Sequence, residues 1–502
     1  MKNIIRLLPI LLFTTLLAKA QNQNLLQNDF SPSIPFQKTA KAGMTFGESP
    51  IAVHHRNFIH PDLADSLQVA VEDYLDELNV VGLAAAVDVE GETWTGTAGM
   101  HTSKLELTPD LNFPIGSVSK TITAATILNM YEEGLLDLED AIADYLPTYD
   151  NINPNITIRQ LLKHTSGIYN YTNHPSFADS LNADLTRIWT PQEMLDYFVS
   201  IPSFPPGASW SYSNTNYVLL GLIIESISGN TFHEEVKTRV LTPYGFEDIR
   251  LYPQEEIAGP YAHIWMDPTG TGIPPIDFYE AGGSLDALFS MAWAAGSYVA
   301  TPATINQWTK ALFGGQIVST ATLDEVQMSF PLGSGLGYVG YGLGTLELNT
   351  FCAEESAWGH GGDIVYSSQD YYFPEDDITV SVHCNDASVN SNNLIALVDE
   401  LHCIISNFEV ATNTTSLAAE DINIQTFPNP FIDQINIQYQ LSQNSQVQIN
   451  ILNTLGQSVA ILVDDKQLAG AHTFTWQVAD PGMYWVQVMV DGEVYLKQVV
   501  KN

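Results

Sequence analysis

Apolar residues recur at two different periods along this chain, and the change of period divides it into regions. After residue 60 they recur at helical spacing, at Leu63, Leu67, Val71, Leu75 and Leu78. This spacing predicts an amphipathic helix. An apolar run over 80–89 predicts a buried strand, and Gly91 turns the chain into a second one. Helical patterns follow, and strand patterns return near 340–384. We expect one sheet built from both ends of residues 61–408 with a helical insertion between them, an α/β or α+β fold.

A strict alternation of apolar and polar residues marks residues 421–502. One face of the first predicted strand is apolar, at Ile435, Ile437, Tyr439 and Leu441. The same pattern repeats over 447–451, and the Pro-Gly pair at 481–482 and the Asp-Gly pair at 491–492 supply turns. The pattern predicts a separate small β-sandwich, joined to the first region by a small-residue, Thr-rich linker over 409–420.

The amino-terminal residues have the pattern of an export signal. Lys2 and Arg6 give the chain a positively charged start, and an apolar stretch follows over 7–17. Residues 18–20 are Ala-Lys-Ala, which fits a small-x-small cleavage site. A membrane anchor is the alternative, but this apolar run is too short to span a bilayer. We expect a signal peptide over 1–20 and a polar lead-in over 21–60. No later run approaches the roughly 18 apolar residues of a span, so we expect an exported chain without a transmembrane segment.

Composition excludes some classes of function. Lysine and arginine number 18 against 57 aspartates and glutamates, which gives a formal net charge of −39. Such a surface repels phosphate backbones and anionic lipid, so the sequence argues against nucleic-acid binding. The 3 cysteines, Cys352, Cys384 and Cys403, are too few for a disulfide framework. One disulfide among them is compatible with the sequence, which does not say which pair forms it.

The strongest local motif reads Phe-Pro-Ile-Gly-Ser-Val-Ser-Lys over 113–120 and opens a predicted helix that Gly134 ends. Ser117 and Lys120 are three positions apart, so they share one face of a helix and the amine can reach the hydroxyl. A serine hydroxyl needs a base to take its proton. Lysine can be that base if burial lowers its pKa. The alternative is a helix cap with a solvated lysine.

A second motif reads Trp-Ser-Tyr-Ser-Asn-Thr-Asn-Tyr over 210–217, ahead of a predicted buried helix. Its turn can present the phenol of Tyr212 and the amide of Asn214 to one cleft. The alternative is a core tyrosine with a satisfied hydroxyl. Between the two motifs, residues 161–167 read Leu-Leu-Lys-His-Thr-Ser-Gly. His164 is either a catalytic base or part of a loop that hydrogen-bonds its own backbone, and we favour the loop.

A third motif reads Trp-Gly-His-Gly-Gly-Asp over 358–363, on a predicted strand. Glycines on a strand indicate that a ligand or another backbone approaches closely. The N–H of Asp363 can donate to an oxyanion together with an N–H from the first turn of the Ser117 helix. The alternative is a turn that contains a surface histidine.

In this order, the motifs resemble the serine β-lactamase/penicillin-binding-protein superfamily. The similarity is to its class C-like branch, which includes D-alanyl-D-alanine carboxypeptidases, D-aminopeptidases and family VIII esterases. The resemblance spans about 61–405 and includes the Leu-Leu-x-His-Thr-Ser-Gly segment. It implies an antiparallel sheet flanked by helices with a helical subdomain, and a reaction that needs no metal and no organic cofactor.

The resemblance also implies roles for the motif residues. Ser117 would be the acylated nucleophile, Lys120 would lower the barrier to its deprotonation, and Tyr212 would shuttle the proton to the leaving group. Asn214 would hold Lys120 and the substrate amide. The strand that orders the substrate would be lined by His360, Gly361, Gly362 and Asp363. The N–H groups of Ser117 and Asp363 would form the oxyanion hole.

The third motif departs from the family pattern. Lactamases and penicillin-binding proteins usually have Lys-Thr-Gly where this chain has His360, Gly361 and Gly362. Lysine is a permanent positive partner for a substrate carboxylate, whereas histidine is mostly neutral at pH 7. The departure disfavours β-lactams and C-terminal D-Ala-D-Ala peptides, and it favours ester or aminopeptidase-like substrates.

The C-terminal region has a resemblance of its own. The segments Phe-Pro-Asn-Pro-Phe over 427–431, Leu-Gly-Gln over 455–457 and Pro-Gly-Met-Tyr over 481–484 are similar to the type IX secretion C-terminal sorting domain, type A-like. That resemblance implies passage across a Gram-negative outer membrane, after which the domain is removed or exchanged for a surface anchor. A carbohydrate-binding sandwich that uses Trp476 and Trp485 is the alternative.

The sequence therefore predicts an exported serine hydrolase that cleaves an ester or amide through a Ser117 acyl-enzyme. The resemblance leaves open an esterase, a D-peptidase or carboxypeptidase, and a β-lactamase. Its partners would be a small-molecule or peptide substrate, peptidoglycan-derived fragments among them, and the type IX secretion machinery. The alternative is a non-catalytic cell-surface protein that binds peptidoglycan or peptide fragments in the same pocket. The joint presence of Ser117, Lys120 and Tyr212 argues against that alternative.

Overall fold

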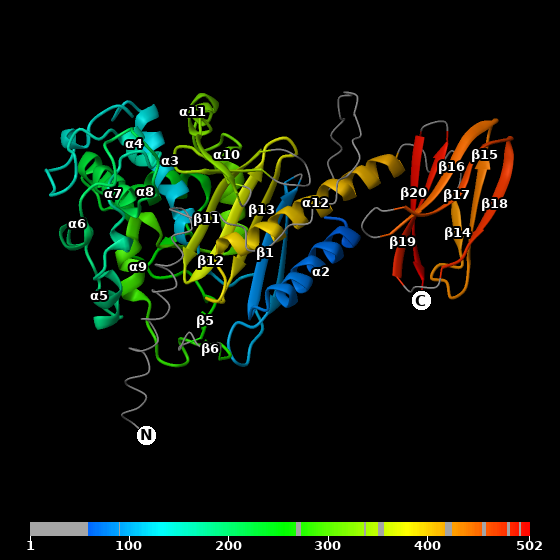
Figure 1. The fold of residues 1–502 in the computed structure, drawn as a ribbon, viewed down its shortest axis with the longest axis horizontal. Helices are drawn as coiled ribbons and strands as arrows, with labels where there is room; N and C mark the ends of the chain where they lie inside the picture. Colours follow the sequence, from blue (N-terminus) through cyan, green and yellow to red (C-terminus); the bar gives the residue numbers. More distant parts are fainter. Residues whose placement is uncertain are drawn as a thin grey trace, which may run out of the picture. The chain divides into compact units, whose positions relative to one another are not determined.

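A computed structural model describes most of the chain (Figure 1). The described residues are 59–89, 91–267, 273–335, 338–349, 356–416, 424–453, 458–478, 482–490 and 493–501. The predicted signal peptide (1–20) lies outside them, as does the predicted lead-in (21–60) except for its last two residues. The chain divides into two compact units, Met1–Cys403 and Ile404–Asn502.

An eight-stranded antiparallel sheet forms the centre of the first unit (Figure 1). In spatial order its strands are β2 (Glu92–Gly99), β1 (Gly82–Val89), β13 (Ile378–Cys384), β12 (Tyr366–Phe373), β11 (Ser356–Ile364), β10 (Leu346–Asn349), β9 (Tyr338–Tyr341) and β8 (Phe330–Gly335). β1 pairs with β13, with Leu83 opposite Cys384, so strands from the two ends of the unit lie side by side. This confirms the prediction of one sheet built from both ends of the region.

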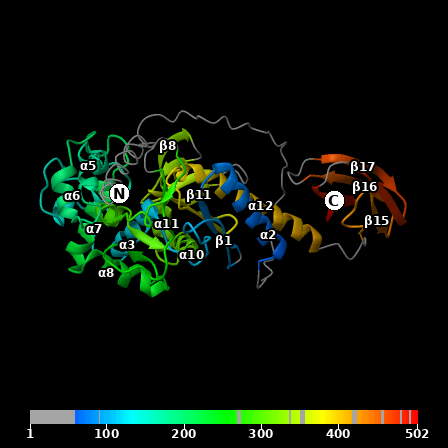
Figure 2. The same cartoon turned by 90° about the horizontal axis from the view of Figure 1, so that it is seen from below.

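Helices cover the part of this sheet formed by β2, β1, β13 and β12. α2 (Pro61–Leu78) packs its buried residues, Leu63 and Leu67 among them, on β1 and β2. α10 (Pro302–Phe313) packs on β1, β12 and β13. α12 (Ser391–Ser416) runs beside α2 in both views (Figures 1 and 2). Because every residue of β1 is buried, both faces of the sheet are covered there.

The segment between β2 and β8 forms the helical insertion. Besides α10, its helices are α3 (Ser119–Glu132), α4 (Ile158–Leu162), α5 (Phe177–Ala183), α6 (Pro191–Phe198), α7 (Asn214–Ser228), α8 (Phe232–Val236), α9 (Asp286–Ala292) and α11 (Thr320–Val326). Short helical turns occur at η1 (Gly116–Val118), η2 (Ile142–Asp144), η3 (Tyr171–Asn173), η4 (Lys237–Leu241), η5 (Thr242–Tyr244) and η6 (Trp293–Ala295). α3 is buried along almost its whole length, and it contacts α7 and β11.

Two small sheets accompany the insertion. β3 (Phe113–Pro114), β7 (Tyr298–Ala300) and β4 (Arg250–Leu251) form one, and β5 (Trp265–Met266) pairs with β6 (Ile276–Asp277) in the other. β3 leads directly into η1 and α3, so its pairing with β7 fixes the entry to the Ser117 motif.

The second unit is an all-β sandwich. One sheet has the order β14 (Gln425–Phe427), β15 (Ile435–Leu441), β18 (Gly470–Trp476). The other has the order β17 (Ser458–Gln467), β16 (Ser445–Leu452), β19 (Gly482–Val490), β20 (Glu493–Lys501). Alternate residues of β15 and β16 are buried in one core to which both sheets contribute. The predicted alternation and the all-β fold are confirmed.

Helix α12 continues into the residues where we expected a linker. It extends to Ser416, whereas the predicted linker covers 409–420, of which 417–420 lie outside the described residues. The segment contains no Pro or Gly, so nothing in it interrupts the helical hydrogen bonds. On α12 Cys403 is disulfide-bonded, and Cys384 in β13 is a buried free thiol. No helix within the described ranges is both long enough and apolar enough to cross a membrane.

Candidate active site

The turn that carries Ser117 is clamped between the main sheet and β7. Gly116 has φ 52°, and a Cβ atom there would lie 2.8 Å from the backbone nitrogen of Asp363. Ser368 Oγ donates to the carbonyl oxygen of Ile115 at 2.9 Å, and the N–H of Ile115 donates to the Tyr298 carbonyl at 3.0 Å. Only glycine permits this approach, because any side chain at 116 would collide with β11.

The amine of Lys120 lies next to the Ser117 hydroxyl. Its Nζ is 3.0 Å from Ser117 Oγ and 2.6 Å from the carbonyl oxygen of Ala295, and the side chain has no exposed surface. No carboxylate among the described residues pairs with it. Burial lowers the pKa of Lys120 well below its ordinary value, which favours the neutral amine. The predicted alternative of a solvated lysine is therefore excluded.

Tyr212 lies next to this pair. Its ring centroid is 4.9 Å from Lys120 Nζ. Its hydroxyl is buried and has no hydrogen-bond partner in the described part of the chain. Burial raises the pKa of the Tyr212 phenol well above its ordinary value, and the neighbouring Ser117 hydroxyl partly opposes this. An unpartnered buried phenol beside Ser117 and Lys120 is a group that a substrate can satisfy.

Asn214 does not hold Lys120, contrary to the expectation from the sequence. Asn214 is the first residue of α7, and its N–H donates to Asn170 Oδ1 at 3.1 Å. The hydrogen bonds of Lys120 Nζ go to Ser117 and Ala295 instead. The sequence places Tyr212 and Asn214 on one turn. It cannot show that the Lys120 amine donates its hydrogen bond to a carbonyl from a distant segment instead.

His360 lies in the middle of β11 with 2% of its surface exposed, so it is not a surface histidine on a turn. Its Nδ1 lies 2.5 Å from the Gly361 carbonyl and its Nε2 lies 3.0 Å from the Tyr341 hydroxyl. A carbonyl can only accept, so the ring proton is on Nδ1 and Tyr341 donates to Nε2. Burial, with a contribution from Lys120, lowers the pKa of His360 to about 3. The ring is neutral at pH 7.

The second half of β11 presents a free edge to the Ser117 turn. β10 pairs with residues 356–359 only, whereas β12 pairs with β11 as far as Ile364. A Cβ atom at Gly362 would lie 2.0 Å from the Ile115 carbonyl oxygen, and one at Gly361 would touch the Gln369 side chain. The carboxylate of Asp363 accepts hydrogen bonds from the N–H and Oγ of Ser391 at 2.8 and 2.7 Å. This anchors the end of β11 to the start of α12.

His164 is fully buried against Tyr212, with 4.3 Å between the ring centroids. Its carbonyl accepts from the N–H of Ser211 at 3.0 Å, and its Nδ1 accepts from the N–H of Ser213 at 3.2 Å. The N–H of His164 itself donates to the Leu161 carbonyl at 3.3 Å, so the loop hydrogen-bonds its own backbone as predicted, and it also bonds the backbone of the Tyr212 segment.

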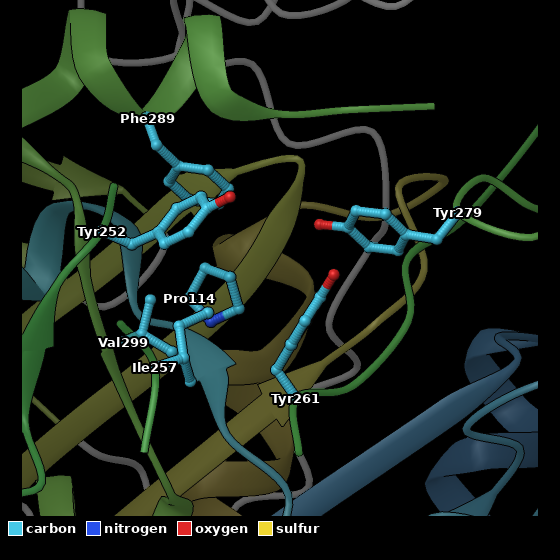
Figure 3. Close-up of a pocket in the computed structure, with 7 residues that line it drawn as sticks. All are labelled: Pro114, Tyr252, Ile257, Tyr261, Tyr279, Phe289 and Val299. Atoms are coloured by element: carbon cyan, nitrogen blue, oxygen red, sulfur yellow. The ribbon is translucent and has the colours of Figure 1, made fainter. Parts of the chain in front are cut away.

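A narrow cavity opens beside this site, at the sheet formed by β3, β7 and β4 (Figure 3). It is lined by Pro114, Tyr252, Ile257, Tyr261, Tyr279, Phe289 and Val299. The hydroxyl groups of Tyr261 and Tyr279 point into it (Figure 3). None of Ser117, Lys120 and Tyr212 lines it, so it is not the place where the proposed nucleophile would act.

Two contributors were not found from the sequence. Ala295, in η6, supplies the carbonyl that orients Lys120, and Tyr341, in β9, supplies the hydroxyl that orients His360. Neither belongs to a motif. A residue pattern does not indicate which backbone carbonyl will accept a hydrogen bond from a distant side chain. Tyr341 lies in a predicted strand, and nothing in its sequence context distinguishes it from other strand residues.

Family models match both units. The model described as beta-lactamase matches residues 67–400, and the model described as secretion system C-terminal sorting domain matches residues 425–502. A helix-flanked antiparallel sheet with a Ser-x-x-Lys helix packed against it defines a serine hydrolase of the β-lactamase/transpeptidase fold. The chain belongs to the β-lactamase family, and it carries a C-terminal secretion sorting domain.

Solved structures of a D-stereospecific amidohydrolase and of a D-amino acid amidase are similar to this chain. The D-stereospecific amidohydrolase from Streptomyces sp. is 29% identical with a TM-score of 0.58, and the match covers 66% of this chain and 97% of that chain. The D-amino acid amidase from Ochrobactrum anthropi SV3, complexed with L-phenylalanine amide, is 25% identical with a TM-score of 0.60. That match covers 69% of this chain and 99% of the amidase.

Curated relatives include penicillin-binding proteins. Penicillin-binding protein 4* of Bacillus subtilis (strain 168) is 35% identical over 156 residues, which are 30% of this chain and 33% of that protein. Penicillin-binding protein 4 of Amycolatopsis lactamdurans is 28% identical over 215 residues, 41% of this chain and 53% of that protein. The chain thus matches between a third and about half of the length of these relatives.

Proposed function

We propose that this chain is an exported serine hydrolase that cleaves an amide or ester bond through an acyl-enzyme on Ser117. The observation that carries the proposal is the 3.0 Å contact between Ser117 Oγ and the buried amine of Lys120. Membership of the β-lactamase family supports it. The free edge of β11 beside Ser117 supplies a surface along which a substrate backbone can lie.

In the proposed reaction, Ser117 Oγ attacks the substrate carbonyl carbon while its proton passes to the neutral amine of Lys120. The carbonyl oxygen gains the negative charge, which the N–H groups of Ser117 and Asp363 stabilise. The bond to the leaving nitrogen or oxygen then breaks as that atom takes the proton by way of Tyr212. Water attacks the resulting ester in the same manner, and this restores the Ser117 hydroxyl and the neutral Lys120.

The electrostatics of the site favour substrates without a carboxylate next to the reacting bond. His360 is neutral and the pKa of Lys120 is lowered, so neither side chain offers a fixed positive charge to a substrate carboxylate. We therefore propose amides and esters of amino acids as the substrate class, ahead of β-lactams and C-terminal D-Ala-D-Ala peptides. Similarity to a D-stereospecific amidohydrolase and a D-amino acid amidase makes D-amino acid amides the first compounds to test.

We also propose that the type IX secretion machinery carries the protein across the outer membrane of a Gram-negative bacterium. The sorting-domain match over 425–502 supports this. Deletion of residues 421–502 should leave the hydrolase in the periplasm of the producing cell, whereas the full chain should reach the surface or the medium. Equal export of both forms, measured by cell fractionation, would contradict this proposal.

The test of the chemistry is the intact mass of the full chain after exposure to a fluorophosphonate probe. The wild type should gain one adduct, and Ser117→Ala should gain none. Hydrolysis of D- and L-amino acid amides, short-chain esters and a β-lactam would then rank the substrates. No adduct on the wild type, combined with saturable binding of peptidoglycan fragments, would overturn the hydrolase in favour of the non-catalytic binding protein.

A further inference from the structure

His164 lies at the centre of an aromatic cluster next to the proposed nucleophile. Its ring centroid is 4.3 Å from that of Tyr212, 4.7 Å from Tyr341, 5.4 Å from Tyr217 and 6.1 Å from Trp210. The backbone of His164 has φ 57°, in the left-handed region. For a residue other than glycine, such a sparsely populated backbone conformation costs about 1–3 kcal/mol of conformational free energy, and residues of this kind cluster at functional sites.

His164 accepts a hydrogen bond from each of the two residues that flank Tyr212 in the sequence. The residue before Tyr212 donates its N–H to the His164 carbonyl, and the residue after it donates its N–H to His164 Nδ1. One residue therefore fixes the backbone on both sides of the phenol. Ring packing alone would not require either bond.

These bonds also determine the tautomer of His164. A backbone N–H can only donate, so Nδ1 is the acceptor and the ring proton is on Nε2. Nε2 is buried and has no hydrogen-bond partner in the part of the chain that the structure describes. Burial, with smaller contributions from Lys120 and His360, lowers the pKa of His164 well below its ordinary value, so the ring stays neutral.

We propose that His164 is a positioning residue that holds the Tyr212 hydroxyl in place for proton transfer at Ser117. The inference rests on the proposed function of Ser117 and goes beyond a loop that only bonds its own backbone. Its physical basis is that a displacement of about 1 Å in a reacting group can cost about 10²-fold in rate. The two bonds to the neighbours of Tyr212 limit that displacement.

Two substitutions separate positioning from packing. His164→Asn keeps an acceptor at the same distance from the backbone as Nδ1, and asparagine tolerates positive φ, but the ring is lost. His164→Phe keeps an aromatic ring and loses the acceptor. We expect His164→Phe to lower kcat about 10²-fold with KM little changed, and His164→Asn to stay within about tenfold of the wild type. The reverse order would show that the ring matters only as packing, and would overturn the inference.

A matched control is His174→Asn. His174 Nδ1 also accepts a backbone N–H two residues on, from Ser176 at 3.2 Å, but it packs on Phe198 away from Ser117. This variant should leave kcat unchanged. Thermal unfolding of all variants, with rates expressed per folded molecule, separates lost fold from lost positioning.

A double-mutant cycle with Tyr212→Phe distinguishes this inference from the proposed function. Once the Tyr212 hydroxyl is absent, His164→Phe should reduce kcat by less than about threefold more, because there is no hydroxyl left to position. Additive losses would overturn the positioning role while leaving the Ser117 hydrolase intact. If the wild type itself gains no fluorophosphonate adduct, the proposed function fails. A crystal structure of His164→Phe then tests the inference through the position of the Tyr212 hydroxyl, and an unmoved hydroxyl would overturn it.

Discussion

Lys120 donates a 2.6 Å hydrogen bond to the carbonyl oxygen of Ala295, a residue 175 positions later in the chain. A neutral amine has two N–H bonds and one lone pair. With one N–H directed at Ala295, the amine has a fixed orientation against the Ser117 hydroxyl, 3.0 Å away. The carbonyl thus orients the amine without supplying the full charge of a carboxylate, which would raise the pKa of the lysine.

Replacement of Lys120 by methionine should abolish most of the reactivity of Ser117. Methionine has a similar length and no proton acceptor, and general-base catalysis contributes typically 10²–10⁴-fold. We expect the second-order rate of fluorophosphonate labelling to fall by about that factor. Circular dichroism should show a wild-type fold, and labelling within threefold of the wild type would contradict the role of Lys120.

Tyr212→Phe should lower the catalytic rate and leave the stability of the fold almost unchanged. The Tyr212 hydroxyl makes no hydrogen bond of good geometry among the described residues, so its removal loses at most its interaction with the neighbouring Ser117 hydroxyl. We expect the free energy of unfolding to change by less than about 1 kcal/mol. In contrast, kcat for an amide substrate should fall about 10²–10⁴-fold. A loss of activity that merely follows a loss of stability, in denaturant titrations of both proteins, would argue against a role in proton transfer.

Gly362→Ala should damage the site more than Gly361→Ala, although the two glycines are neighbours. A Cβ atom at Gly362 would lie 2.0 Å from the Ile115 carbonyl oxygen, which is backbone and cannot move without the Ser117 turn. At Gly361 the nearest atoms, at 3.0 Å and beyond, belong to the Gln369 side chain, which can shift. We expect Gly362→Ala to lose about 1–3 kcal/mol of stability and most labelling by the probe. Thermal melts and labelling rates of both variants provide the comparison, and equal effects would contradict it.

The pH dependence of labelling should report the neutral amine of Lys120. Because burial lowers the pKa of Lys120 well below 10.5, the folded protein loses this proton at lower pH than the unfolded chain does. The labelling rate should therefore rise with pH and reach its plateau well below pH 10.5. In the same window the unfolded chain binds more protons, so this residue makes stability rise with pH. A rate that still increases at pH 10.5 would show an unperturbed lysine.

His360 should contribute to loss of stability in acid. Its pKa is about 3 in the folded protein and 6.5 ordinarily, so between these values the unfolded chain binds a proton that the folded protein does not. Stability therefore falls as the pH drops through this window. His360→Gln removes the titrating group, and its unfolding free energy should decline less steeply from pH 6.5 to about 3. Parallel declines in urea titrations would contradict the lowered pKa.

Much of the fold could be predicted because it depends on local patterns. The spacing of Leu63 and Leu67 predicts α2, and the alternation over 435–441 predicts β15, since burial of one face depends only on period. The pairing of strands from both ends of the first unit was also predicted. The extension of α12 beyond residue 408 was not, because the end of a helix in a segment without Pro or Gly has no local signal.

The candidate site could be predicted in part. Three motifs located Ser117, Lys120, Tyr212 and the strand at 360–363, because residue types and spacing are preserved in the sequence. The predicted contact of Asn214 with Lys120 is absent, because the amine of Lys120 makes its hydrogen bonds with Ser117 and with the carbonyl of Ala295. His164 was correctly described as part of a hydrogen-bonded loop. Its bonds to the neighbours of Tyr212 connect segments about fifty residues apart, and no local pattern encodes them.

The order of the motifs, the two units and the periods of their strands and helices follow from the amino-acid sequence alone. The charge state of Lys120, His164 and His360 follows from the fold, because desolvation depends on every segment packed around a side chain. The fold also decides which cysteines are linked, since Cys384 is enclosed in β13 while Cys403 is bonded. Residue patterns specify which groups are present, and packing specifies which of them meet and in what protonation state.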